Sequence, residues 1–416
     1  MFDRLFTRPV ALARHRAGPL VEERLAYLGH LASKGISYRT LREVAQILLS
    51  VARRLGLADR PGEGIRHDEI RRQAILAARR RSRYPKRKDG SSARRVFRVQ
   101  ATRWLQFLGR LEPRPTPPNP HATLVATFAE YMRSDRGLSP STIRSRCWLV
   151  RKFLDRLNIT TGSLHGITIS QIDDTFMTML RQDGYARCTI QTWADGLRAF
   201  FRYAEMRGWC RCGLAATIES PRVFTQTALP MGPSWEVVRR LFATTEGDRP
   251  TNIRDRAILM LLAIYGLRAS EVAHLRLEDF DWERELLTVA CTKTRRTRIY
   301  PLCHPVGDAV LRYLKEVRPR CAERVVFLCM RAPIRRLKCL YHVVSARLRP
   351  LGFGLPHVGP HALRHACATH LLAQGLSLNE IGDHLGHQDP DATRIYAKVD
   401  LIGLRQVANL DLGGLL

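Results

Sequence analysis

Five prolines between Glu112 and Pro120 make this stretch the clearest linker in the chain. They are Pro113, Pro115, Pro117, Pro118 and Pro120. Because proline lacks an amide proton and its ring clashes with the preceding helical turn, the stretch can sustain neither a helix nor a sheet. We therefore predict that it ends an N-terminal region, residues 1–119, and that the rest of the 416 residues folds beyond it.

The N-terminal region has a basic and partly helical sequence pattern. Apolar residues recur at helical spacing from Tyr38 to Leu55, at Leu41, Val44, Ile47, Leu48 and Val51. A basic segment follows, which contains Arg79, Arg80, Arg81, Arg83, Lys86, Arg87, Lys88, Arg94 and Arg95. Such a segment is either a solvated loop or an arm that contacts phosphates. The sequence leaves both readings open, and with them the role of the region.

Residues 120–222 predict a helical domain. Ser139 and Pro140 form a typical helix start, with serine as the N-cap and proline in the first helical position. Two apolar stripes follow at helical spacing, one at Ile143, Cys147, Val150, Leu154 and Leu157 and one at Ile190, Trp193, Leu197, Phe200, Phe201 and Ala204. Stripes of this kind pack into a common core.

Residues 223–416 predict a mixture of helices and strands. A buried helix from about Asn252 ends at Gly266, and Leu286–Ala290 and Arg298–Leu302 predict a β-hairpin around a basic turn. Further helices are expected from Pro360, from Ser377 (in a capping box with Glu380) and from Asp389. The chain is therefore expected to be mainly helical, with a small antiparallel sheet in this third region.

The charge of the chain indicates its partner. Lysine and arginine outnumber aspartate and glutamate by 68 to 38, a formal charge of +30. The basic residues spread along the whole chain, which favours a long track on nucleic acid over the single basic helix that binds a membrane surface. The longest apolar run, Ala257–Leu267, is too short to cross a bilayer, and the N-terminus lacks the apolar core of a signal peptide.

The ten cysteines show neither a disulfide framework nor zinc spacing, which is typical of reduced thiols in the cytoplasm. Together with the charge and the lack of a membrane segment, this leads us to expect a cytoplasmic protein that binds DNA and no membrane.

Six polar residues of the third region form an ordered set, although each alone has an ordinary structural explanation. Along the chain they are Arg268, Lys293, His361, Arg364, His387 and Tyr396. His387 follows Arg364 by 387 − 364 = 23 residues, and Tyr396 follows His387 by 396 − 387 = 9 residues. In order and spacing the set resembles the tyrosine recombinases, or phage-type integrases. The resemblance covers residues 223–416 closely and 120–222 more loosely, and it departs at Ala362, where many members have an acidic residue.

The resemblance implies a fold, a reaction and partners. Residues 120–222 would form a core-binding (SAM-like) DNA-binding domain and residues 223–416 the catalytic domain, and the two would close around DNA as a clamp. Tyr396 would attack the scissile phosphate of double-stranded DNA at a specific recombination site. The 3′-phosphotyrosine would then be resolved by strand exchange and religation. Four protomers would act on two sites, with neither ATP nor a metal as cofactor.

The chemistry of the ordered set agrees with this reaction. Arg268 and Arg364 stay charged at any working pH and donate paired hydrogen bonds, as the clamping of a phosphate requires. The phenol of Tyr396 has an unperturbed pKa of about 10, so its reactivity depends on nearby positive charge. The resemblance implies the other roles. Lys293 would protonate the 5′ oxygen, and His361 and His387 would orient the phosphate and help transfer protons. Glu271 would support the first arginine or the first histidine.

Three alternatives compete with this interpretation. His361 and His365 are spaced as on a zinc-binding helix face, but acidic or cysteine ligands are missing and Arg364 would repel a cation. A non-catalytic DNA-binding regulator would have lost reacting residues, whereas all are present. A type IB topoisomerase shares the chemistry on a single duplex, and the integrase-like sequence around His361 and Tyr396 disfavours it.

The tail after the proposed nucleophile, Ala397–Leu416, is unusually apolar. It contains Val399, Leu401, Ile402, Leu404, Val407, Leu410, Leu412, Leu415 and Leu416. Burial of such a surface, at about 25 cal/mol per Å², favours docking over exposure to water. The tail is expected to dock on its own catalytic domain or, as the resemblance suggests, on a neighbouring protomer.

Overall fold

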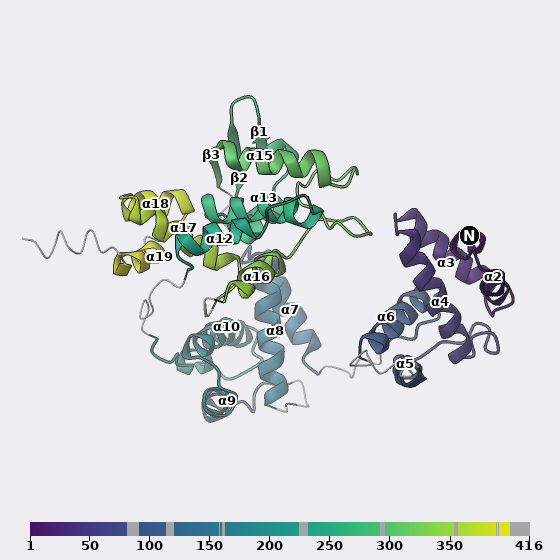
Figure 1. Cartoon of the computed structure of the whole chain (residues 1–416). Coiled ribbons are helices and arrows are strands. Elements are labelled where there is room, and N and C mark those ends of the chain that lie inside the picture. The colour runs from purple at the N-terminus through teal and green to yellow at the C-terminus, as the bar shows by residue number, and fades with distance from the viewer. Residues whose placement is uncertain are drawn as a thin grey trace, which may run out of the picture. The chain divides into compact units, whose positions relative to one another are not determined.

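The computed structural model describes most of the chain (Figure 1). The described residues are 1–80, 91–113, 120–157, 159, 163–223, 232–291, 296–352, 357–387, 389 and 391–399. The chain divides into two compact units, one of Arg114–Thr227 and one that takes in Met1–Pro113 and Ala228–Leu416. No helix among the described residues is long and apolar enough to span a membrane.

Six helices of the N-terminal region share a hydrophobic core of their own. They are α1 (Phe2–Leu5), α2 (Pro9–Arg16), α3 (Val21–Ser33), α4 (Tyr38–Arg54), α5 (His67–Arg80) and α6 (Ser91–Phe107), coloured purple to blue in Figure 1. The helix expected over Tyr38–Leu55 is confirmed as α4, and its apolar residues Leu41, Val44 and Leu48 are buried. The basic segment begins at the end of α5 and ends within α6, which contains Arg94 and Arg95, and residues 81–90 lie outside the described part.

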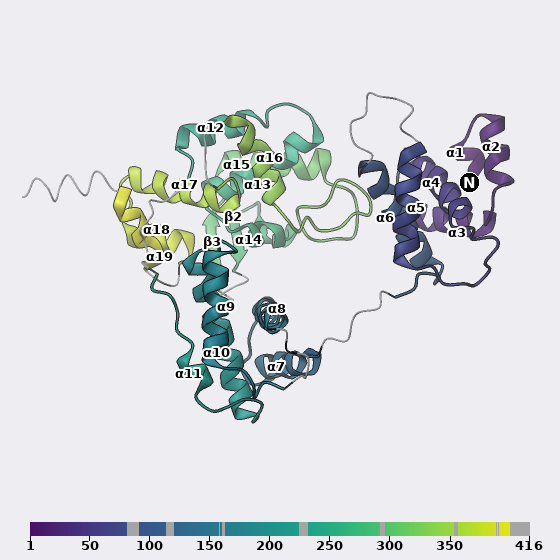
Figure 2. The same cartoon turned by 90° about the horizontal axis from the view of Figure 1, so that it is seen from below.

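The unit Arg114–Thr227 is entirely helical in its described residues. It contains α7 (Ala122–Ser134), α8 (Pro140–Arg156), α9 (Ile169–Arg181), α10 (Arg187–Met206) and α11 (Leu214–Thr217), which Figure 2 shows from below. The predicted helix start is confirmed, since the Ser139 hydroxyl accepts a hydrogen bond from the Thr142 amide at 3.2 Å. Both predicted apolar stripes lie in the core of this unit, where Phe153, Phe200 and Phe201 are fully buried.

A three-stranded antiparallel sheet lies in the third region, in the order β1 (Phe280–Asp281), β2 (Leu286–Ala290) and β3 (Thr297–Pro301). The predicted hairpin is confirmed, with Leu286 opposite Pro301 and Ala290 opposite Thr297. Strand β1 was not expected, because two residues are too few to show an alternating pattern. Residues 292–295 of the turn lie outside the described part of the chain.

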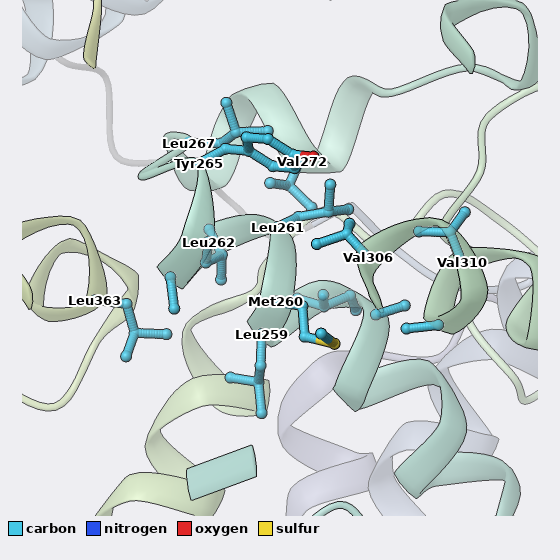
Figure 3. Close-up of a cluster of buried hydrophobic side chains, with 14 of the residues drawn as sticks. Leu259, Met260, Leu261, Leu262, Tyr265, Leu267, Val272, Val306, Val310 and Leu363 are labelled. Atoms are coloured by element: carbon cyan, nitrogen blue, oxygen red, sulfur yellow. The ribbon is translucent and has the colours of Figure 1, made fainter. Parts of the chain in front are cut away.

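The buried helix α13 (Pro250–Ile264) forms the centre of the third region. Figure 3 shows side chains on several of its sides, among them Leu259, Leu261 and Leu262, within one apolar cluster. A helix buried on all sides cannot shift without opening cavities in its surroundings, which costs several kcal/mol for each large side chain, on the order of 2–5. It packs against α12 (Trp235–Ala243), α14 (Ala269–His274), α15 (His304–Arg312), η2 (Tyr313–Val317) and α17 (Pro360–Ala373). The same region contains η1 (Leu277–Asp279), α16 (Tyr341–Leu348) and η3 (Arg349–Leu351).

The C-terminal helices pack into a second, smaller apolar cluster. They are α17 (Pro360–Ala373), α18 (Leu378–Leu385), α19 (Asp391–Arg394) and η4 (Ile395–Val399), of which α17, α18 and α19 lie side by side in Figures 1 and 2. The predicted starts at Pro360 and at the capping box of Ser377 and Glu380 are confirmed. Helix α19 begins at Asp391, whose amide donates to the Asp389 carboxylate at 2.9 Å, while residue 390 lies outside the described part.

Gly266 joins these two clusters where α13 ends. Its φ is +60°, and a Cβ built there would lie 2.4 Å from a methyl group of Leu385 and 3.2 Å from the Cys367 sulfur. Gly352 has a comparable φ of +74°, and no atom of the described residues is recorded within 4 Å of a Cβ built there. Substitution of Gly352 therefore adds backbone strain without crowding by these residues. We expect Gly266→Ala to lower the free energy of unfolding by about 1–3 kcal/mol more than Gly352→Ala, because the added methyl overpacks the junction. Urea unfolding of both variants measures the difference, and equal losses would contradict the crowding argument.

Candidate active site

Arg268 stands at the start of α14, directly beyond the end of the central helix. Its backbone amide and its Nη1 donate to the two oxygens of Glu271 at 2.8 and 2.9 Å, so the predicted support of this arginine by Glu271 is present. Burial opposes ionisation of the fully buried Glu271 carboxyl, but the hydrogen bonds and charges of Arg268 and Arg298 outweigh it and lower its pKa. The Arg268 side chain itself remains 28% exposed, so its guanidinium is open to a ligand.

Arg298 on β3 is the second cation on the same carboxylate. Its Nη2 donates to Glu271 at 2.9 Å and its Nη1 to the His384 carbonyl at 3.0 Å. The sequence did not single out this residue, which was one of several arginines near the hairpin turn. Its contacts span 27 and 86 residues of chain, and no local pattern reports contacts of that range.

Arg364 on α17 is buried, with 3% of its surface exposed. Its Nη1 donates to the Gly266 carbonyl at 2.6 Å and its Nη2 to the Leu385 carbonyl at 2.7 Å. Burial and the neighbouring charge of Arg268 lower its pKa to about 10, which leaves the group charged at neutral pH. Two of its five N–H donors are used in these bonds, so others remain for a ligand.

The three arginines meet at the C-terminal end of α18. Arg298 donates to the carbonyl of His384, Arg364 to that of Leu385 and Arg268 to that of Gly386, the last at 3.1 Å. The last carbonyls of a helix lack partners within the helix and carry its negative dipole end, so cations stabilise them. This arrangement gathers three guanidinium groups immediately before His387.

His387 follows Gly386, whose φ of +67° ends α18. The Nδ1 of His387 is 2.7 Å from the hydroxyl of the buried Thr393, which fixes the ring. Burial and the charges of Arg364 and Arg268 lower the pKa of His387 to about 4, so the ring is neutral at physiological pH. A small cavity of about 170 Å³ opens beside it, lined by Cys291, Arg296, Thr297, Arg298, Asp383, Gly386 and His387.

Tyr396 on η4 is buried, with 2% of its surface exposed. Its ring packs in the apolar cluster of the C-terminal helices, beside Cys367 and Leu385. Its hydroxyl is 2.9 Å from Nδ1 of His365 on α17. Burial raises the pKa of the phenol to about 12, and the opposing effect of the Arg364 charge is smaller. In this DNA-free state, therefore, nearby positive charge does not make the phenol acidic.

The remaining members of the ordered set differ in how the structure places them. His361 lies in the first turn of α17 with its side chain exposed, and its ring is 4.6 Å from that of His365, edge to face. Arg268, His361, Arg364, His387 and Tyr396 are all linked to α17 or to the end of α18 by the contacts above. Lys293 lies outside the described residues.

The chemistry of this arrangement favours an anion. Three guanidinium groups and two imidazoles lie close together, and the Glu271 carboxylate is shared by two of the arginines, while Asp383 lines the cavity beside His387. Within the described residues, no three or more histidine, cysteine, aspartate or glutamate side chains are grouped so that they could hold a metal ion. A phosphate suits such a site, because planar guanidinium groups donate two parallel hydrogen bonds to its oxygens.

Sequence reasoning missed Arg298, Thr393 and His365. His365 was noticed only as the second member of a zinc-like pair with His361, and the structure gives its Nδ1 to Tyr396 instead. The spacing of four residues between His361 and His365 correctly predicted that both rings lie on one side of α17. It could not identify the partner of His365, because Tyr396 lies 31 residues away in the chain.

Two family models match the chain. The model of the phage integrase family matches residues 234–401, and that of the phage integrase N-terminal SAM-like domain matches residues 125–208. The first contains every member of the ordered set, from Arg268 to Tyr396. The second falls within the helical unit that precedes it.

Curated relatives and solved structures agree with these matches. A protein of Sinorhizobium fredii named as an integrase/recombinase, y4rA, is 36% identical over 68% of this chain and 69% of its own length. The tyrosine recombinase XerC of Alcanivorax borkumensis is 32% identical over 69% of this chain and 93% of its own. The recombinase XerH, solved in a post-cleavage complex with its difH substrate, has a TM-score of 0.52 at 17% identity and covers 69% of this chain and 84% of its own. A lambda integrase dimer bound to a core site has a TM-score of 0.51 at 17% identity over 66% and 94%, and both structures share the fold of this chain.

Proposed function

This chain belongs to the phage integrase family of tyrosine recombinases, which cut and rejoin DNA at specific sites, and we propose that its nucleophile is Tyr396. The observation that carries this proposal is the position of the Tyr396 hydroxyl. Tyr396 lies on η4, and its hydroxyl is 2.9 Å from Nδ1 of His365 on α17, the helix that also contains His361 and Arg364. A phenol close to the arginine of a phosphate site supports the role of attacking group.

The reaction we propose forms and breaks one bond at each step. The Tyr396 oxygen attacks the scissile phosphate, a 3′-phosphotyrosine forms, and the 5′ oxygen leaves as a hydroxyl after it takes up a proton. Attack by the 5′ hydroxyl of the exchanged strand reverses the step and releases the tyrosine. Because the phosphotyrosine conserves the energy of the phosphodiester, neither ATP nor a metal is consumed.

The charged residues divide the remaining work. Arg268 and Arg364 hold the non-bridging oxygens, where negative charge accumulates in the transition state, and this is worth several kcal/mol in a preorganised site. His361 and His387, both adjacent to the arginines, orient the phosphate and relay protons. Lys293, in the turn between β2 and β3, protonates the leaving 5′ oxygen. Glu271 positions Arg268 by accepting its hydrogen bond, and Arg298 holds Glu271 in place by donating to the same carboxylate.

The substrate we propose is double-stranded DNA carrying a specific recombination site. The SAM-like region within residues 120–222 and the catalytic region 223–416 would close around the duplex as a clamp. A net charge of +30 supports extensive contact with phosphates. The structural neighbours XerH and lambda integrase were solved bound to their own sites, difH and a core site. The reaction would take place in the cytoplasm.

A plasmid assay tests the proposed function. A supercoiled plasmid carrying two copies of the DNA that flanks the gene for this chain is incubated with the protein in excess EDTA. We expect deletion or inversion of the intervening segment on this plasmid and no change on a plasmid without the flanking DNA. Relaxation of both plasmids would indicate a topoisomerase, and binding without any change of topology would indicate a regulator. A strict requirement for a divalent metal would contradict the mechanism.

The active assembly we propose is a tetramer on two DNA sites, with the C-terminal tail docked on a neighbouring protomer. Residues 400–416 lie outside the described part of the chain, whereas Val399 packs against the same apolar cluster as Tyr396. A contact passed from each protomer to the next closes a ring when its rotation permits.

Truncation after Val399 tests the role of the tail. It retains Val399, so the cluster around Tyr396 stays intact, while the apolar tail is lost. We expect binding to a single site to remain nearly unchanged, because all residues proposed to bind phosphate are retained, and pairing of two sites to weaken strongly. Gel-shift titration measures the first and a two-site synapsis assay the second. Recombination of two sites at the full rate by the truncated protein would rule out a role in assembly.

A further inference from the structure

His365 contacts the one atom that must react if the proposed function is right. Its Nδ1 lies 2.9 Å from the Tyr396 hydroxyl, and the two rings meet edge to face with 5.7 Å between their centres. Among the described residues, Nδ1 is the one hydrogen-bond partner recorded for this hydroxyl. A neutral phenol has a single proton to donate, and burial makes an unmade hydrogen bond costly. With His365 neutral and its proton on Nε2, the phenol donates and Nδ1 accepts.

The Tyr396 ring and its hydroxyl are held by different groups. The ring lies in the apolar cluster that it shares with Cys367 of α17 and Leu385 of α18. Such packing places the ring but does not choose the direction of the O–H bond. Among the described residues, the hydrogen bond to His365 sets that direction.

His365 is itself held in place from two sides. The ring of His361 packs against it edge to face at 4.6 Å. On the backbone side, Gly232 approaches α17 so closely that a Cβ built on it would lie 2.9 Å from Cβ of His365 and 2.7 Å from the Ala366 amide nitrogen. A side chain constrained in this way offers its acceptor at a fixed point, which is what orientation of a reacting group requires.

We propose that His365 is a positioning residue of the recombination reaction, which aligns the Tyr396 hydroxyl for attack by accepting its hydrogen bond at Nδ1. This inference rests on the proposed role of Tyr396 as nucleophile. It assigns His365 a task separate from the phosphate orientation and proton transfer proposed for His361 and His387.

Acceptance of a hydrogen bond, and not of the proton, is the role that the energetics favour in this state. Burial lowers the pKa of His365 to about 4, and the nearby charges of His361 and Arg364 add to this effect. Burial also raises the pKa of Tyr396 to about 12. Because the two pKa values differ so widely, the population of the neutral hydrogen-bonded pair exceeds that of the phenolate–imidazolium pair by many orders of magnitude. In this DNA-free state the proton therefore stays on the phenol.

Two amide substitutions of His365 provide a matched test. In His365→Asn the amide oxygen occupies nearly the position of Nδ1, whereas in His365→Gln it reaches the position of Nε2, and His365→Leu removes the acceptor altogether. None of the three can take up a proton at neutral pH. The measurement is the single-turnover rate of covalent complex formation on a nicked suicide substrate at saturating protein, together with DNA affinity and melting temperature.

We expect His365→Asn to cleave within about fivefold of the parent and His365→Gln and His365→Leu to be slower by about 100-fold, the usual cost of a misplaced reacting group. DNA affinity should be unchanged in all three, because His365 is assigned no contact with DNA. If His365→Asn is as slow as His365→Gln, the position of the acceptor does not matter and the inference is wrong. It is equally wrong if His365→Gln and His365→Leu cleave at the parent rate. Should the leucine variant fail to fold, the comparison of asparagine with glutamine decides alone.

The same assay separates this inference from the proposed function. Tyr396→Phe defines the background. A covalent band in that variant means that the nucleophile lies elsewhere, and the proposed function then fails whatever His365 does. If the band is absent in Tyr396→Phe while the three His365 variants cleave at the parent rate, Tyr396 is still supported as the nucleophile. Only the positioning role of His365 is then wrong.

Discussion

Tyr396→Phe is expected to abolish covalent capture of DNA while leaving DNA binding intact. The substitution removes only the hydroxyl and its hydrogen bond to His365, and the ring keeps its place in the apolar cluster. The loss of stability should be about 1 kcal/mol, the usual contribution of one hydrogen bond. The loss of cleavage should be complete, because no other atom of the side chain can attack phosphorus.

A labelled suicide substrate and denaturing gel electrophoresis measure this outcome. Tyr341→Phe is a suitable control, since Tyr341 is an exposed tyrosine of the same catalytic region whose hydroxyl accepts from Arg349. The control should form the covalent complex at the parent rate. A covalent band that persists in Tyr396→Phe would place the nucleophile on another residue.

The second large effect is expected at the arginines. Arg268→Ala and Arg364→Ala should each slow cleavage by raising its activation free energy by about 3 kcal/mol or more. This is the loss of transition-state stabilisation seen when an oxyanion donor is removed. Affinity for DNA should change far less, because the two groups act on charge that develops only in the transition state. Equal losses in rate and affinity would instead make them ordinary backbone contacts.

The structure distinguishes the two arginines. Arg364 is buried and satisfies the carbonyls of Gly266 and Leu385, so its removal should also cost stability, about 1–3 kcal/mol for each buried acceptor left unpaired. Arg268 is partly exposed, and Glu271 keeps Arg298 as a partner when it is lost. Arg268→Ala is therefore the cleaner test. Arg268→Lys, which keeps the charge but loses the planar fork, should recover only part of the rate. Arg284→Ala, at an 81% exposed side chain in the turn after β1, should leave the rate unchanged.

Local signals in the sequence predicted the elements that local interactions define. Ser139 and Ser377 cap the helices that they were expected to cap, and strand β2 has the predicted bounds. The N-terminal helices show the limit of this approach. Helix α3 begins after Leu20, which has no capping side chain and adopts a left-handed conformation with φ of 54°, so nothing in the sequence announced its start. Its helical structure depends on packing in the core of that region.

The candidate site was predictable in its membership but not in its connections. The ordered set named Arg268, Arg364, His387 and Tyr396 because family resemblance carries order and spacing. It could not show that Arg364 binds backbone carbonyls, since backbone acceptors have no sequence signature. Nor could it show burial of Tyr396, whose environment is built from three separate helical segments. The roles of the individual residues in the reaction remain predictions for the experiments above.

The three arginines on the last carbonyls of α18 have a consequence for how this family of sequences diverges. A descendant of this chain that gave up DNA cleavage could lose the Tyr396 hydroxyl in one substitution at little structural expense. It could not lose Arg364 without leaving the carbonyls of Gly266 and Leu385 unpaired. Selection for a folded domain alone would thus preserve Arg364 after the chemistry had gone. In a homologue, an arginine at the position of Arg364 therefore indicates an intact fold, whereas a tyrosine at the position of Tyr396 indicates a working enzyme.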